Sequence, residues 1–320
     1  IAPFLGTSSL LTSTIYFALV FLFVMNRSKI LNVIGKFLTP FIIIILLAVI
    51  FIGMTTTPEV INPSAFKTPF VSGLLEGYQT FDAIGAVVIG GVLVISMNFK
   101  KETSFEIKKE IIIKAGIVAG IGLLIIYTGL IYSGVIFSDT FAENASRTEI
   151  LTSLSTQTLG SIGTTFLSVL VALACFTTGV GIVTGTSDYF KGLFNNSQKA
   201  YTITAVIGCV LGVLIGQFDV HYIIDIALPA LMFIYPITIV LILLNVLPEK
   251  LASPTVFKSV VGVTFLFSIP DFLKFIVNPQ SLTRIQSYIP FSEHSLGWVL
   301  PAIIVFIFAN LLVKKKTTNE

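Results

Sequence analysis

Five polar or small residues gather inside an otherwise apolar part of the chain, in the sequence EGYQTFDAIG at positions 76–85. They are Gly77, Tyr78, Gln79, Thr80 and Asp82. An apolar helix in lipid breaks only where protein or a watery cavity satisfies the freed backbone N–H and C=O groups. The sequence therefore predicts two half-helices here, separated by a break that offers hydroxyl, amide and carboxylate groups to a small molecule.

A break of this kind presents two opposite partial charges. The N–H groups that begin the second half-helix carry partial positive charge, and the carbonyl groups that end the first carry partial negative charge. Discontinuous carrier helices hold a small zwitterion and a cation in this way. We therefore predict Gly77, Tyr78, Gln79, Thr80 and Asp82 as substrate-binding residues. Asp82 also fits a second interpretation, in which it only caps the second half-helix, and the two interpretations are compatible.

A second polar stretch, ALACFTTGVGIVTGTSDYF at positions 172–190, places Ala174, Thr177 and Thr178 at i, i+3 and i+4. Residues at this spacing share one face of a helix. The Ala174 carbonyl and the two hydroxyl groups would offer three oxygens to one cation such as sodium, because hard cations take oxygen ligands. In the alternative interpretation the hydroxyl groups bond back to a carbonyl one turn earlier and serve only helix packing.

Other kinds of chemistry find no support in the residue pattern. Cys175 and Cys209 lie inside apolar runs and have neither a disulfide framework nor a metal-ligand spacing. His221 and His294 are far apart, and no phosphate-binding loop of the G-x-x-x-x-G-K type occurs. We therefore predict that the protein is not an enzyme, needs no cofactor and binds no nucleic acid.

The elements that position these residues are apolar helices. The chain of 320 residues is 55% hydrophobic and only 11% charged, whereas soluble domains carry about 25% charged residues. Its apolar runs are long enough to cross a hydrocarbon core of about 30 Å. This pattern predicts an all-α polytopic membrane protein. Nine spans are expected, at 9–26, 31–54, 70–98, 111–137, 163–187, 200–216, 221–247, 255–277 and 297–313.

The basic residues indicate the direction of these spans. If the connector around Arg27 is cytoplasmic and the sides alternate, 15 of the 19 lysines and arginines fall on the cytoplasmic side, as does the C-terminus. Ile1 then lies outside. An odd number of spans and a first residue other than methionine favour a piece of a longer protein. One or more spans would precede Ile1, an odd number if the true N-terminus is cytoplasmic; a processed protein with an external N-terminus is the alternative. We treat 1–320 as a single, partial transmembrane domain.

Two further patterns concern packing. The sequence RTEILTSLSTQTLG, within the external segment 138–162, has helical spacing and predicts a short helix on the outer face. Several glycine pairs have the small-xxx-small spacing that brings helices into close contact. They are Gly116 with Gly120, Gly181 with Gly185, Gly208 with Gly212, and Gly212 with Gly216.

Two of these stretches carry a resemblance to a known family. EGYQTFDAIGAVVIGGVLVISMN and ACFTTGVGIVTGTSDYF resemble the signature segments of the bacterial branched-chain amino acid:cation symporters, a branch of the amino acid–polyamine–cation superfamily. The likeness continues through DIALPALMFIYPITIVLILL and GWVLPAI, over essentially the whole chain. It implies about twelve spans, built as two inverted five-helix repeats plus two more, with the break above in the sixth span and the first three spans absent from this chain.

The resemblance also implies a function. Leucine, isoleucine and valine would enter through the bacterial cell membrane together with sodium or a proton, with lipid around the protein and no obligatory protein partner. Related sodium carriers contribute one carbonyl and two hydroxyls at i, i+3, i+4 from the eighth span, so the resemblance favours the cation interpretation of Ala174, Thr177 and Thr178. A channel is the rival class, but a channel needs a continuous polar lining, and the polar groups here gather in two patches.

Overall fold

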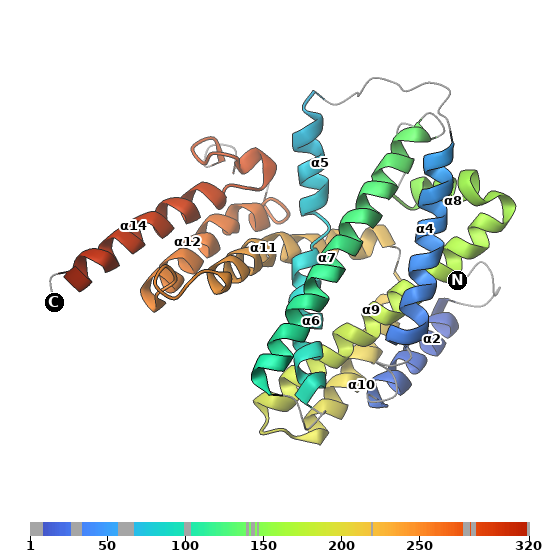
Figure 1. The fold of residues 1–320 in the computed structure, drawn as a ribbon, viewed down its shortest axis with the longest axis horizontal. Helices are drawn as coiled ribbons and strands as arrows, with labels where there is room; N and C mark the ends of the chain where they lie inside the picture. The colour runs from blue at the N-terminus through green and yellow to red at the C-terminus, as the bar shows by residue number, and fades with distance from the viewer. Residues whose placement is uncertain are drawn as a thin grey trace. The chain divides into compact units, whose positions relative to one another are not determined.

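The fold is entirely helical over the residues that the computed structural model describes (Figure 1). These residues are 9–26, 34–56, 67–98, 104–138, 141, 145, 147–218, 220–277, 282 and 286–318. The elements are α2 (Ser9–Met25), the π-helical turn η1 (Ile34–Leu38), α4 (Thr39–Thr55), α5 (Pro69–Tyr78), α6 (Asp82–Asn98), α7 (Phe105–Ile136), α8 (Arg147–Leu159), the 3-10 turn η3 (Gly160–Ile162), α9 (Gly163–Leu193), α10 (Gln198–Ile215), α11 (Val220–Val246), α12 (Pro254–Leu273), the 3-10 turn η4 (Ser292–His294) and α14 (Val299–Thr318).

Apolar helices occupy every predicted span. Among the described residues, seven segments are long and apolar enough to cross a membrane, including the interrupted segment Pro69–Ile95. Two shorter apolar helices, Ser9–Met25 and Val299–Val313, stand at the first and last predicted positions. The chain is therefore an all-α polytopic membrane protein, while the count of nine spans and the inverted-repeat arrangement stay predictions. The short helix predicted in the segment 138–162 is confirmed as α8, while its place on the outer face stays a prediction.

The chain divides into two compact units, and each is described here by itself. Unit 1 consists of Ile1–Lys67 and Val88–Gln217, and unit 2 consists of Thr68–Val87 and Phe218–Glu320. The boundary between Val87 and Val88 falls inside α6, so that α5 and the start of α6 belong to unit 2. The single transmembrane domain expected from the sequence stays a prediction.

In unit 1, α2 packs against α9 and α10 through a small buried core. Val20, Val24 and Ala205 are almost fully buried there. The glycines of α10 let the helices approach closely, because a side chain on Gly212 would overlap the ring of Phe17. This confirms the packing role predicted for the glycine spacing of α10.

The second group of helices in unit 1 joins α4 to α7 and α8, and α8 to α9. A Cβ on Gly53 would overlap the side chain of Ser133, which is a close contact between α4 and α7. By contrast, Gly116 and Gly120 face open space among the described residues, so a packing role for that pair stays a prediction.

Unit 2 is built on α11, α12 and α14, which lie side by side (Figure 1). One face of α12 is buried along its whole length, and its character changes from apolar to polar along the helix. Val256 and Val260 form the apolar part, and Thr264, Ser268 and Asp271 form the polar part. The polar part ends next to the segment 286–298, which precedes α14, and this is the feature of the fold that matters most for the site.

Candidate functional site

The predicted helix break is confirmed. The first half-helix, α5, ends at Tyr78, and the second, α6, begins at Asp82. The backbone groups of the break are satisfied locally, since the Gln79 N–H donates to the Leu75 carbonyl at 3.0 Å and the Thr80 N–H donates to the Gly77 carbonyl at 3.2 Å. The Thr80 hydroxyl donates to the same Gly77 carbonyl at 2.8 Å. The chain thus changes direction in the span with little loss of hydrogen bonding.

The residue that makes the break differs from the one expected. Gly77 is the glycine among the predicted residues and the natural candidate for an unusual backbone, but it lies within the last turn of α5 and has no positive φ. Phe81 instead adopts φ 54°, in the left-handed region that bulky residues rarely occupy. Such a residue persists only where its surroundings hold it.

A tyrosine of α11 provides those surroundings. The Tyr235 ring packs edge-on against Phe81, with ring centroids 5.1 Å apart, and edge-on against Tyr78, with centroids 4.9 Å apart. Edge-to-face pairs at this distance are favourable beyond the area they bury. Tyr235 itself is buried. One ring of α11 therefore contacts both sides of the break.

The predicted substrate-binding residues surround this point. Tyr78 and Gln79 are half-buried, whereas Gly77, Thr80 and Asp82 are exposed. Asp82 is the first residue of α6, where a carboxylate meets the partial positive charge of the helix N-terminus. This position suits the cap interpretation and equally suits a site at the break. The substrate-binding role of all five residues stays a prediction.

The three predicted cation ligands lie on one face of α9, as the spacing required. The hydroxyl groups of Thr177 and Thr178 both donate to the Ala174 carbonyl, each at 2.9 Å. This is the back-bonded arrangement of the alternative interpretation, but it also gathers three oxygens around one point. The hydroxyl lone pairs remain able to accept a cation, so the donor set fits sodium as a partial shell. These residues belong to unit 1 and the helix break belongs to unit 2.

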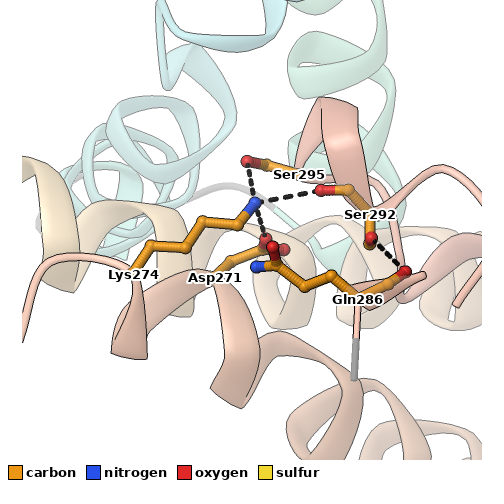
Figure 2. A network of polar contacts seen from close by, with 5 residues as sticks. All are labelled: Asp271, Lys274, Gln286, Ser292 and Ser295. Atoms are coloured by element: carbon orange, nitrogen blue, oxygen red, sulfur yellow. Dashed lines mark hydrogen bonds and ion pairs between the residues drawn. The ribbon is translucent and has the colours of Figure 1, made fainter. Parts of the chain in front are cut away.

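An ion-pair network at the end of α12 was missed in the sequence. The Lys274 ammonium group donates to the Asp271 carboxylate at 2.8 Å, to the Ser292 carbonyl at 2.9 Å and to the Ser295 hydroxyl at 3.3 Å. Figure 2 shows this ammonium group between α12 and the segment that leads to α14. The Asp271 side chain is only 2% exposed. The sequence signal was the stretch PDFLK, which places a carboxylate and a lysine at i and i+3 at the end of an apolar run. Charged residues within such runs are functional-site candidates by default.

No cluster of three or more histidine, cysteine or acidic side chains suited to a metal ion exists in the part of the chain that the structure describes. This result concerns sites for metals such as zinc. It leaves open the set of carbonyl and hydroxyl oxygens on α9, which contains none of those residue types.

Comparison with known proteins gives a consistent result. The sequence model of the family described as "Branched-chain amino acid transport protein" matches residues 3–316. The branched-chain amino acid transport system 2 carrier protein of Pseudomonas aeruginosa is 29% identical over 316 residues, covering 97% of this chain and 72% of that protein. The branched-chain amino acid permease BraB of Bacillus subtilis is 32% identical over 328 residues, covering 98% of this chain and 72% of that protein.

Permease BrnQ of Escherichia coli is 28% identical over 325 residues, covering 97% of this chain and 71% of that protein. No solved structure matches the chain. The match to the family extends over nearly every residue, including both stretches singled out in the sequence. It is a family of transport proteins and not of enzymes. The chain therefore belongs to the branched-chain amino acid transport protein family.

Proposed function

We propose that the protein takes up leucine, isoleucine and valine into the bacterial cell, driven by inward movement of sodium or protons. The observation that carries the proposal is the interrupted helix α5–α6 in a chain of this family. Discontinuous helices are the usual place where secondary transporters bind substrate and coupling ion. The permeases named above support branched-chain amino acids as substrates.

The oxygens on α9 bear on which of the two ions is coupled to uptake. The Ala174 carbonyl with the Thr177 and Thr178 hydroxyls supports sodium, because these groups are neutral oxygen donors held close together. The C-terminus and the basic connectors are cytoplasmic in this proposal. Substrate and cation would thus move inward together.

The direct test is uptake of radiolabelled isoleucine by vesicles that contain the full-length protein. We expect uptake to rise when a sodium gradient or a proton gradient is applied inward, and to be competed by leucine and valine. Vesicles without the protein are the control. Uptake that is indifferent to both gradients would contradict the symport proposal, and stepwise single-channel currents would favour a channel instead.

A further inference from the structure

Four polar atoms of unit 2 are buried without a hydrogen-bond partner among the described residues. They are the Tyr78 hydroxyl, the second carboxylate oxygen of Asp271, the Gln286 side-chain amide nitrogen and the Trp298 indole nitrogen. We call these four side chains the polar cluster. Asp271 is 2% exposed and Trp298 is 6% exposed. Buried polar groups in native proteins nearly always have a partner, so this concentration needs an explanation.

The four groups come from three parts of unit 2 that meet at the helix break. The Trp298 indole lies beside the Tyr78 hydroxyl without completing a hydrogen bond, and the Asp271 carboxylate is near enough to interact electrostatically with that hydroxyl. Tyr78 and Trp298 also belong to one hydrophobic core cluster. Figure 2 shows the Gln286 side chain extending toward Asp271.

The rest of the network holds these groups in place. The Lys274 ammonium group already has three acceptors, and the Ser292 hydroxyl donates to the Gln286 carbonyl at 2.7 Å. One carboxylate oxygen of Asp271 accepts a hydrogen bond from Lys274, and the other has no partner among the described residues. The ion pair makes the local charge neutral, so the cluster suits a ligand with no net charge.

The unpaired atoms match one kind of ligand. A tyrosine hydroxyl, an indole N–H and a side-chain amide are donors, and the remaining carboxylate oxygen is an acceptor. The three donors would repel a simple cation, and the carboxylate would repel a simple anion, so neither ion fits the cluster. A zwitterion offers a carboxylate to the donors and an ammonium group to the acceptor, and charge-assisted hydrogen bonds of this kind are the strong ones.

An apolar hollow adjoins the cluster. Its volume is about 420 Å³, and the Trp298 side chain forms part of its wall. The other lining side chains are aliphatic or aromatic and come from α11, α12 and α14, with Val240, Val260 and Ala302 among them. This volume is within the usual range for ligand pockets, about 300–1,000 Å³. The aliphatic side chain of a zwitterionic amino acid would fit in this hollow.

We propose that the polar cluster binds the charged end of the transported amino acid, with the aliphatic end in the adjoining hollow. Asp271 accepts hydrogen bonds from the ammonium group. The other three members donate to the carboxylate. This inference rests on the proposed function and extends its substrate site from the helix break to Asp271, Gln286 and Trp298.

The test measures competition against radiolabelled leucine on the purified full-length protein. The competitors are leucine, 3-methylbutylamine, which lacks the carboxylate, and 4-methyl-2-oxopentanoate, which lacks the ammonium group. Tyr78→Phe and Trp298→Phe each remove one donor and keep an aromatic ring. Each should weaken leucine binding about tenfold. Tyr78→Phe should leave the affinity for the amine unchanged, and Trp298→Phe, which also alters the wall of the hollow, should change it less than the affinity for leucine.

Asp271→Asn should give the complementary result. Leucine and the amine should both bind about tenfold more weakly, while the affinity for the oxo acid stays the same. Ala302→Leu narrows the hollow and should weaken the binding of free leucine more than the binding of free alanine. The matched control is Tyr288→Phe, which removes a hydroxyl from the same segment at a side chain that is 81% exposed, and which should change none of these affinities.

The outcomes separate the two proposals. Equal weakening for all three competitors would mean general structural damage and would overturn the inference, as would leucine affinities of Tyr78→Phe and Trp298→Phe that equal the unaltered protein. In both cases the unaltered protein still binds leucine, so the proposed function stands. Failure of the unaltered protein to bind or transport leucine would overturn the proposed function and this inference with it.

Discussion

At the scale of single residues, the hydroxyl groups of Thr177 and Thr178 can serve helix packing or ligate a cation. They donate to the Ala174 carbonyl in this structure, as threonines in apolar helices commonly do. The same oxygens form a compact donor set for a cation. Geometry alone does not separate packing from ligation, but the dependence of uptake on sodium does.

Thr177→Val and Thr178→Val each keep the side-chain shape and delete one oxygen. We expect the sodium concentration for half-maximal uptake to rise about fivefold or more in each variant, with a smaller change in isoleucine affinity at saturating sodium. Thr202→Val is the matched control, because the Thr202 hydroxyl also bonds back one turn, to the Gln198 carbonyl at 3.1 Å. Unchanged sodium midpoints in both α9 variants would show that these hydroxyls serve packing only.

Asp82 can be tested by removing its charge and keeping its shape. If the charge of Asp82 organises the site, as proposed, Asp82→Asn should lower isoleucine uptake about tenfold, equivalent to about 1.4 kcal/mol. Asparagine caps a helix nearly as well as aspartate, so full activity of the variant would reduce Asp82 to a cap. Glu110→Gln serves as the control, since Glu110 is an exposed carboxylate on α7 paired with Lys114 at 2.6 Å.

At the scale of elements, the break between α5 and α6 depends on one strained residue and one ring. Phe81 has a left-handed backbone, and Tyr235 packs against the rings on both sides of the break. The left-handed conformation costs an ordinary residue roughly 1–2 kcal/mol, a cost that glycine avoids. The stability of the break is therefore expected to follow backbone conformation as well as ring packing.

At position 81 we therefore expect glycine to be more stable than alanine, the reverse of their order inside a helix. Phe81→Gly and Phe81→Ala both lose the ring, but the glycine variant should be more stable by about 1 kcal/mol, because alanine keeps the strain. At a regular helix position the order is the opposite, by about 1 kcal/mol. Leu93→Gly and Leu93→Ala in α6 provide that reference pair. Thermal unfolding of the purified variants measures the stability of glycine relative to alanine at both positions. If the alanine variant is the more stable one at position 81 as well as at position 93, residue 81 does not have a left-handed backbone.

Local sequence determined the helices well and the details of the site less well. Run length and hydropathy predicted each apolar helix, because these properties belong to neighbouring residues in the chain. The break was predicted from Gly77 and the polar residues around it, yet the residue with the left-handed backbone is Phe81, which no local pattern indicated. The Tyr235 contact with the break joins positions more than 150 residues apart. No local pattern contains such a pairing.

At the scale of the whole molecule, Lys274 holds α12 to the segment before α14. Its partner Asp271 is buried, and three hydrogen bonds converge on its ammonium group. Removing one member of a buried pair leaves an uncompensated charge, whereas an exposed pair contributes little. The Lys274 side chain thus helps to hold the segment 286–298 against α12, together with the buried Trp298.

Lys274→Met should lower the free energy of unfolding by about 3 kcal/mol, because Asp271 then lacks its counter-ion. Adding Asp271→Asn to this variant should restore part of the loss. Lys114→Met is the control, since both members of its pair are more than half exposed. We expect that variant to change the free energy by less than about 1 kcal/mol. Equal effects of the two lysine substitutions on thermal unfolding would contradict a structural role for the buried pair.

The contact between Gly212 of α10 and the Phe17 ring of α2 also restricts how the sequence can evolve. A Cβ at position 212 would overlap the ring where it stands, so a substitution there requires the Phe17 side chain to move aside or to become smaller. A larger side chain at position 212 beside an unchanged Phe17 should therefore weaken the packing of α10 against α2. Related sequences should seldom carry bulky residues at both positions. Aligned relatives provide the check, and the two positions should covary across lineages.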